Sequence, residues 1–264
     1  MSQAITPLFW VIITLLALLF MQRWVHTHLF GLSLLLMGKS ERAVVLYALV
    51  LFPGVLLHEV SHWLMATFVG VRTGKLSLRP RQHPDGSIQL GYVEYYKGRG
   101  LDPVRESLIG GAPLISGTIV ILLIGYQVFD VTALAELVQT GQMSGIGAAL
   151  QQLYQTPDFL LWLYLLFAIA NGMMPSRSDR RAWPGFVIVM VVLAIIVYWL
   201  GLADRVIVGL SEPVTSMLRY LSLAFAMAVG VDVFFMVVIA ILENVIGRMK
   251  GVSVVYNNGR TNIP

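Results

Sequence analysis

Cysteine is absent from this chain of 264 residues. Its absence excludes a disulfide framework, a thiolate metal site and a cysteine nucleophile. A metal ion in this protein would therefore be held by histidine and carboxylate side chains. The chain offers 5 His and 14 Asp plus Glu for that purpose.

Charged residues are scarce as well. Asp, Glu, Lys and Arg together make up 12% of the chain, whereas a soluble domain carries about 25%. This scarcity excludes a disordered chain, a nucleic-acid-binding module and a soluble enzyme of ordinary build. Hydrophobic residues make up 57%, and the mean hydropathy is +0.78. The composition therefore indicates a protein that crosses a membrane several times.

Six apolar stretches approach the roughly 20 residues that cross a bilayer. They cover 8–21, 43–69, 108–129, 159–174, 184–202 and 217–246. The first has no cleavage site of small residues after it and is expected to stay as an anchor. The second contains Pro53 and Gly54, which should kink it. Residues 24–42 are predicted to form an interfacial or re-entrant segment, and residues 203–216 a separate amphipathic piece. The sequence thus predicts an all-α polytopic membrane protein with about six transmembrane helices.

A polar stretch, 70–107, interrupts the apolar pattern. Apolar and polar residues alternate over 76–79 and again over 88–95, with turn residues between the two runs. Alternation bounded by turn residues predicts β-strands. We therefore expect a small hairpin over 72–96, with its turn near 83–87.

Loop charges set the expected orientation. Stretch 70–107, the turn 175–183 and the tail 248–264 each carry several Lys and Arg, whereas 130–158 contains none. By the positive-inside rule, the hairpin and the tail are predicted to lie in the cytoplasm and 130–158 outside. The first span does not fit this scheme, because it leaves the basic residues that follow it outside.

His58-Glu59-Val60-Ser61-His62 forms an H-E-x-x-H motif inside the second apolar stretch. On a helix, positions i and i+4 share a face, so both imidazoles can bind one Zn²⁺. Glu59 can accept a proton from a metal-bound water and pass it to a leaving amine. Ionisable side chains in an apolar span are costly and indicate a functional site. We therefore predict a zinc site with His58 and His62 as ligands and Glu59 as general base.

A catalytic zinc site needs a third protein ligand. Asp179 is the first candidate, because it lies just past the end of the fourth apolar stretch, at the depth expected for the motif. Asp232 is the rival because it lies inside an apolar run, although we favour an internal hydrogen bond that fixes helix packing. Glu243 ranks third. Glu136 ranks last, since it belongs to the opposite side of the membrane.

These features resemble the site-2 protease family of intramembrane zinc metalloproteases. The likeness covers roughly residues 43–185 and rests on the motif inside a membrane span, followed two spans later by the segment from Asn171 to Asp179. That family has an Asn-x-x-Pro stretch that ends in Asp-Gly, and Asn171 and Asp179 have the family's separation. Here Pro175 follows Asn171 by one residue more than is usual, and Arg180 stands in place of the Gly.

The resemblance implies hydrolysis of peptide bonds in or near transmembrane segments of other proteins, with Zn²⁺ as the cofactor. It implies that Asp179 is the third zinc ligand. It also implies that Asn171 binds the extended substrate, for which an amide can both donate and accept hydrogen bonds. The hairpin over 72–96 is similar in place to the family's membrane-associated hairpin, and an exposed strand there could hold a substrate by edge pairing. Gly110 and Gly111, at the start of the third span, are expected to allow close helix packing.

The chain is accordingly divided into four parts. These are an anchor span and interfacial segment (1–42), a metalloprotease membrane core (43–185), two further spans (186–247) and a polar tail (248–264). The expected partners are a transmembrane protein substrate and the lipid bilayer, in the simplest case a bacterial cell membrane, and no nucleic acid. The oligomeric state stays open.

Two alternatives remain. A membrane metalloprotease of another clan would use a Glu as third ligand, and Glu243 would then matter instead of Asp179. A non-catalytic transporter or scaffold would bind the metal without hydrolysis. A transporter should show repeated halves or further ligands, and an inactive relative would usually lose the Glu of the motif. The chain shows no internal repeat, and Glu59 is present.

Overall fold

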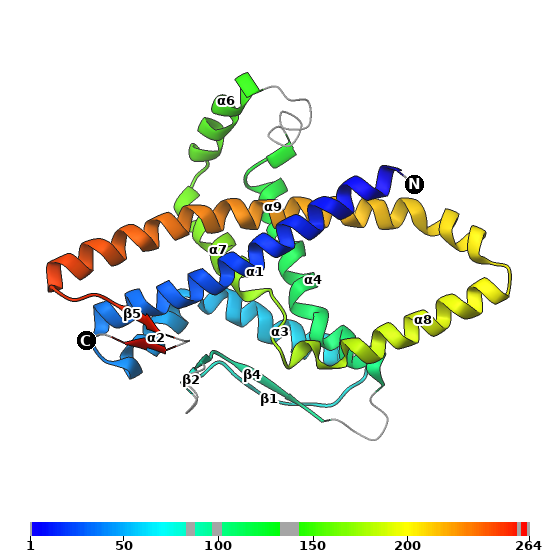
Figure 1. Ribbon diagram of the computed structural model, residues 1–264, viewed down its shortest axis with the longest axis horizontal. Helices are drawn as coiled ribbons and strands as arrows, with labels where there is room; N and C mark the ends of the chain where they lie inside the picture. The colour runs from blue at the N-terminus through cyan, green and yellow to red at the C-terminus, as the bar shows by residue number, and fades with distance from the viewer. Residues whose placement is uncertain (1, 83–87, 97–101, 133–142, 258–259, 263–264) are drawn as a thin grey trace.

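The computed structural model describes residues 2–82, 88–96, 102–132, 143–257 and 260–262, and it is mostly helical (Figure 1). The helices are α1 (Ser2–Met37), α2 (Ser40–Val50), α3 (Phe52–Phe68), α4 (Pro103–Gln127), α6 (Met143–Tyr154), α7 (Phe159–Gly172), the short 3-10 helix η1 (Asp179–Ala182), α8 (Trp183–Trp199) and α9 (Ala203–Lys250). The strands are β1 (Thr73–Ser77), β2 (Arg81–Gln82), β3 (Ile88–Gln89), β4 (Tyr92–Tyr95), β5 (Val255–Asn257) and β6 (Arg260–Asn262). The predicted helical membrane fold with a small antiparallel sheet is confirmed.

Four helical stretches in the described part of the chain are long and apolar enough to cross a membrane: 5–37, 103–127, 179–199 and 203–250. Two helix pairs, α2 with α3 and α6 with α7, reach that length only when each bent pair counts as one span. The protein therefore has four to six candidate spans. α2 and α3 meet at an angle of 72°, and α3 begins directly before Pro53, which confirms the expected kink.

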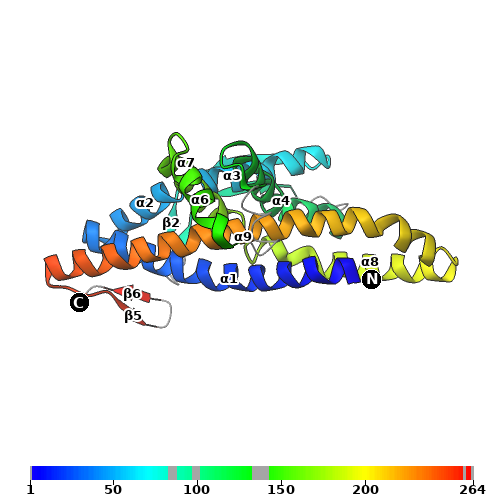
Figure 2. The ribbon, with the colours of Figure 1, turned by 90° about the horizontal axis from the view of Figure 1, so that it is seen from above.

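α1 and α9 lie side by side and run in the same direction (Figures 1 and 2). The structure differs here from two expectations. Residues 24–37 continue α1 as one helix of 36 residues instead of forming a separate segment. Residues 203–216 are likewise the first part of the 48-residue α9. Packing accounts for the unbroken α1, because Leu18, Val25 and Leu35 are all buried along its length.

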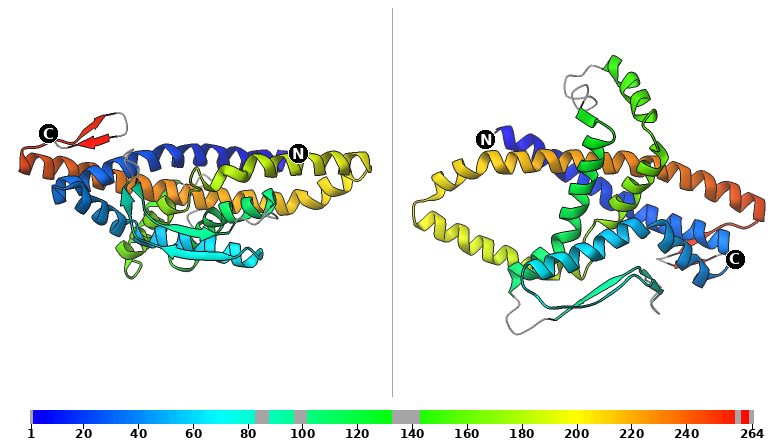
Figure 3. Two further views of the ribbon diagram at one scale, coloured as in Figure 1. Left: turned by 90° about the horizontal axis from the view of Figure 1, so that it is seen from below. Right: turned by 180° about the vertical axis from the view of Figure 1, so that it is seen from behind.

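A second group of helices, α3, α4 and α7, packs together and crosses the long pair (Figure 3). Its core contains fully buried apolar side chains, including Ile121 of α4 and Phe167 of α7. α3 contacts both α4 and α7. Because α3 carries the H-E-x-x-H motif, this group sets the surroundings of the predicted site.

The polar stretch after α3 forms a long two-stranded hairpin. β1 pairs antiparallel with β4, with Leu76 opposite Val93, and β2 pairs antiparallel with β3. The strands predicted over 72–96 are confirmed. The turn expected at 83–87 lies outside the described residues. The hairpin packs against α3 through β1 and β4.

The polar tail also forms a hairpin, made of β5 and β6. Tyr256 donates its hydroxyl hydrogen to Glu243 of α9, and its ring lies 4.4 Å from the ring of His28 of α1. Nearby, Lys250 Nζ donates to Leu35 O at 2.6 Å. The C-terminal ends of α1 and α9 are therefore joined to each other.

Candidate metal centre

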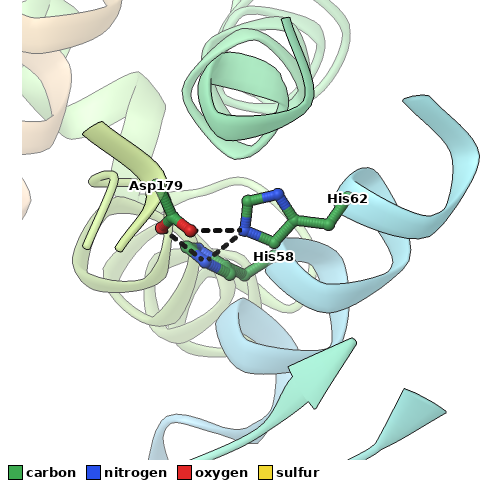
Figure 4. Close-up of side chains that lie close together, drawn as sticks. All are labelled: His58, His62 and Asp179. Carbon is green, nitrogen blue, oxygen red and sulfur yellow. Dashed lines mark hydrogen bonds and ion pairs between the residues drawn. The ribbon is translucent and has the colours of Figure 1, made fainter. Parts of the chain in front are cut away.

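His58 and His62 lie one helical turn apart on α3 and turn their rings to the same side (Figure 4). Their Nε2 atoms are 3.0 Å apart. The rings meet edge to face, with centroids 4.6 Å apart. The spacing of the motif thus brings both imidazoles to one point.

Asp179 joins the two histidines from a distant part of the sequence. It is the first residue of η1, and its Oδ2 and Oδ1 lie 3.5 Å and 3.4 Å from the Nε2 atoms of His58 and His62, respectively. One ligand atom from each of the three residues lies within 4.8 Å of the others. The structure therefore places the first-ranked third ligand beside the histidine pair (Figure 4).

Main-chain carbonyl groups fix the orientation of both rings. His58 Nδ1 donates to Gly172 O at 2.7 Å, and His62 Nδ1 donates to Ile109 O at 2.8 Å. A carbonyl oxygen can only accept, so each Nδ1 carries the proton and each neutral ring keeps its lone pair on Nε2. The two lone pairs and the Asp179 carboxylate then point at one another, which is repulsive unless a metal ion or a further proton lies between them.

The spacing of the three groups fits zinc. Ligand atoms about 2.0–2.1 Å from a tetrahedral zinc ion lie roughly 3.3 Å from one another. The two Nε2 atoms are 3.0 Å apart, close to that value, and each lies 3.4 or 3.5 Å from one Asp179 oxygen, Oδ1 for His62 and Oδ2 for His58. Two neutral imidazoles and a carboxylate also form a donor set that leaves a fourth position open for water or substrate. The residues present therefore fit a catalytic zinc site.

Two glycines let the elements that carry the ligands approach closely. A Cβ atom on Gly54 of α3 would lie 1.9 Å from Ala168 O of α7, and one on Gly110 of α4 would lie 2.0 Å from Asp179 O. Any side chain at either position would push these elements apart. Small residues at helix contacts are the usual means of close approach in membranes. The close packing expected at Gly110 is confirmed.

A serine turn holds the carboxylate of Asp179. Ser176 N donates to Asp179 Oδ2 at 2.6 Å, and Asp179 N donates to Ser176 Oγ at 3.3 Å. Residues 176–178 are exposed, whereas the side chains of the three ligands are only 9–16% exposed. This turn therefore forms the exposed border of the centre.

Glu59 lies between the two histidines in sequence and is 7% exposed. Its carboxylate is close enough to His58, His62 and Asp179 to interact electrostatically with all three. The hairpin touches the same side chain, because a Cβ atom on Gly91 would come within 2.8 Å of Glu59 Cγ. The predicted general base is thus close both to the ligand cluster and to the hairpin.

Asn171, predicted to bind substrate, is 3% exposed. Its Nδ2 donates to Phe167 O at 3.0 Å and to Asp232 Oδ1 at 2.7 Å. Both amide hydrogens are therefore used inside the protein, whereas Asn171 Oδ1 has no hydrogen-bond partner among the described residues. Asp232, the rival ligand, is 1% exposed and makes the internal hydrogen bond that the sequence favoured.

Glu243, the third-ranked candidate, lies away from the histidine pair. Glu243 accepts hydrogen bonds from Tyr256 and, at 2.8 Å, from His28 Nδ1. It belongs to the contact between α9 and the C-terminal hairpin. Glu136 lies outside the described residues.

Sequence reasoning missed the groups that orient the ligands. Gly172 and Ile109 act through main-chain carbonyls, which no side-chain pattern reveals. Gln22 donates through Nε2 to Asn171 O at 3.0 Å. Gln22 stands directly after the apolar stretch 8–21 and before Arg23, so no signal in the sequence indicated that its side chain would be used inside the protein.

Comparison with protein-family models, with curated proteins and with solved structures finds no match to this chain. A fold or a composition alone does not imply an activity. The function therefore has to be argued from the geometry and chemistry of the metal centre.

Proposed function

We propose that this protein is an intramembrane zinc metalloprotease that hydrolyses peptide bonds in or near the transmembrane segments of other proteins. The observation that carries the proposal is the convergence of His58, His62 and Asp179 within 4.8 Å, with Glu59 beside them. The elements that carry these residues are apolar enough to belong to membrane spans or bent spans. The motif's resemblance to the site-2 protease family supports the same reading.

In the proposed mechanism, His58, His62 and Asp179 hold the metal. A bound zinc ion supplies a Lewis acid that polarises the scissile carbonyl and makes water a better nucleophile. As the water oxygen bonds to the carbonyl carbon, Glu59 accepts the proton that the water releases. Glu59 then delivers that proton to the amine nitrogen as the C–N bond breaks. The carbonyls of Gly172 and Ile109 keep the imidazoles from turning away.

The position of the hairpin supports an extended substrate. A helical substrate hides its carbonyl groups in its own hydrogen bonds and has to unwind before it can be cut. The hairpin packs on α3 through β1 and β4 and touches Glu59 at Gly91. An extended segment added to a strand edge would therefore lie near the general base, held by main-chain hydrogen bonds.

The test is zinc content and peptide cleavage measured on the same purified protein. We expect one zinc per chain in the wild type, little zinc in His58→Ala and Asp179→Asn, and full zinc in Glu243→Gln. Glu59→Gln should keep its zinc and lose cleavage by a factor of at least about 10² to 10⁴. For the cleavage assay, the purified protein is placed in liposomes together with a mixture of single-span peptides that have varied core sequences. The products are identified by mass spectrometry.

Three outcomes decide between the proposals. A wild type without zinc, purified under conditions that do not strip metal, would overturn the protease proposal. Zinc without cleavage of any peptide would favour a metal-binding scaffold. Loss of zinc in Glu243→Gln with retention in Asp179→Asn would favour a metalloprotease of another clan.

A further inference from the structure

The end of α7 is held by three other helices. An α-helix leaves its last carbonyl groups without partners in the helix. At this end, Asn171 O accepts a hydrogen bond from Gln22 Nε2 of α1, and Gly172 O accepts one from His58 Nδ1 of α3. The Asn171 side chain reaches α9, where its Nδ2 donates to Asp232 Oδ1 at 2.7 Å. α1, α3 and α9 thus meet at two consecutive residues of α7.

The bond between Asn171 and Asp232 is deeply buried. Asn171 is 3% and Asp232 1% exposed. α9 is an apolar candidate span, and a polar group in such surroundings is costly unless it is paired. Both side chains are almost inaccessible to bulk solvent, and the Asn171 amide donates to Asp232 Oδ1 from within this buried region. Small shifts of the end of α7 relative to α9 would break this bond.

Two ligands of the metal centre depend on where this helix end lies. The Gly172 carbonyl, one residue after Asn171, orients the His58 ring at 2.7 Å. The chain then runs directly from α7 into the turn that carries Asp179. A displaced α7 end would therefore rotate one ligand and move another.

We propose that Gln22, Asn171 and Asp232 are positioning residues of the metal centre, which hold the end of α7 where it orients His58 and presents Asp179. This inference rests on the metal centre proposed above, though not on the protease activity. It gives Asn171 a role inside the protein in place of a contact with substrate. It also gives the buried carboxylate of Asp232 a role that is not metal binding.

The test compares variants that remove the bond with variants that keep it. Asp232→Leu and Asn171→Leu remove one partner each. Asp232→Asn keeps an oxygen that accepts from the Asn171 amide. Thr215→Val is the matched control, because Thr215 is also buried on α9 and donates its hydroxyl hydrogen to Ser211 O of its own helix.

Three properties are measured for each variant. Competition with a chelator gives zinc affinity, the absorption spectrum of the cobalt-substituted protein reports ligand geometry, and amide hydrogen exchange over residues 173–182 of the metal-free protein reports how firmly the turn is held. Asp232→Leu and Asn171→Leu should lower zinc affinity by about 10- to 100-fold, as loss of an outer partner of a metal ligand does. They should also change the cobalt spectrum and speed exchange. Asp232→Asn and Thr215→Val should resemble the wild type.

Gln22→Leu tests the α1 contact separately. Gln22 is uncharged and only partly buried, so Gln22→Leu leaves no buried carboxylate without a partner. This variant therefore remains informative if the leucine variants of the buried pair do not fold. We expect a smaller loss of zinc affinity and faster exchange over 173–182. Unchanged affinity and exchange in Gln22→Leu and in the leucine variants that fold would overturn the proposal.

Other outcomes point elsewhere. Loss of zinc in Asp232→Asn equal to that in Asp232→Leu would make Asp232 a ligand. A raised KM with unchanged zinc affinity in Asn171→Leu would make Asn171 a substrate contact. Zinc binding without peptide cleavage would overturn the protease proposal and leave the positioning role standing. If the wild type binds no zinc, exchange over 173–182 in the metal-free protein still decides whether these residues hold the turn.

Discussion

Gly110 and Gly111 are neighbours on α4, yet their surroundings differ. A Cβ atom on Gly110 would lie 2.0 Å from Asp179 O, whereas one on Gly111 would meet nothing within 4 Å. Both glycines lie inside a helix, where Gly costs roughly 0.5–1 kcal/mol relative to Ala. At Gly111 nothing offsets that cost in the described structure. At Gly110 the missing side chain is what lets η1 and Asp179 approach α4.

The two alanine substitutions should therefore have opposite effects. Gly110→Ala forces η1 away from α4, and we expect a loss of about 1–3 kcal/mol in stability, as for other overpacked sites, together with lower zinc occupancy. Gly111→Ala should raise stability by about 0.5–1 kcal/mol and leave zinc occupancy unchanged. Thermal unfolding in detergent and metal analysis measure both effects. Equal behaviour of the two variants would contradict the contact between Gly110 and Asp179.

At the scale of elements, the main-chain groups at the ends of the helices need hydrogen-bond partners from outside the helix. α7 has 14 residues, a length of about 21 Å at 1.5 Å per residue, which is too short to cross a hydrocarbon core of about 30 Å. At least one end of α7 therefore lies inside the hydrocarbon core, where bulk water cannot pair with its free main-chain groups. Side chains from α1 and α3 provide the partners, and one of them is His58, a candidate metal ligand.

The start of α4 is held by a helix cap. Asp102 Oδ1 accepts from Arg105 N at 2.9 Å, and Pro103 occupies the first turn. The Arg105 amide hydrogen bonds to the charged carboxylate and thereby lowers the pKa of Asp102 below its ordinary value. Because the folded pKa is the lower one, the cap stabilises the helix at pH values above the unfolded pKa.

Removal of this cap should loosen the first turn of α4, which leads to the Ile109 carbonyl that orients His62. We expect faster amide exchange over residues 103–107 in Asp102→Ala at neutral pH, and little change in Asp102→Asn, because Asn also caps helices. The difference between wild type and Asp102→Ala should fade in acid, as the pH falls through the lowered pKa of Asp102 and the folded carboxylate takes up its proton. A difference that persists undiminished in acid would show that the charge of the carboxylate does not contribute.

At the scale of the whole molecule, the ends of α1 and α9 lie together. Lys250 Nζ donates to the carbonyls of Leu35 and Leu36, two of the last groups of α1. The two helices run in the same direction (Figure 2). Their C-terminal ends should therefore emerge on the same side of the membrane. The basic residues after α1 then share a side with the basic end of α9, which agrees with the positive-inside rule.

This arrangement can be tested by thiol labelling, since the natural chain has no cysteine to interfere. Lys39 and Ser253 are both exposed. We expect Lys39→Cys and Ser253→Cys to react with a membrane-impermeant reagent from the same side, and Gln151→Cys on α6 to react from the other. Labelling of Lys39→Cys and Ser253→Cys from opposite sides would contradict the joined helix ends.

Much of the local structure follows from the sequence. The apolar stretches are long because a helix needs about 20 apolar residues to cross a bilayer. The hairpin residues form strands because apolar and polar residues that alternate every second position match the two faces of a β-strand. His58 and His62 share a face because four residues make about one helical turn. These are short-range relations, so the motif, its general base and the approximate number of spans could be predicted before any fold was known.

Packing between distant segments decided the rest. The sequence contains several carboxylates that could complete the metal centre, and only the contact between Gly110 and Asp179 and the serine turn place one of them beside the histidines. The role of Asn171 likewise depends on Asp232, 61 residues away, and the unbroken α1 and α9 depend on the surface each buries. Only the tertiary structure decides these pairings, because the free energy of a buried polar group depends on its partner in space. The separation of two residues along the chain does not identify that partner.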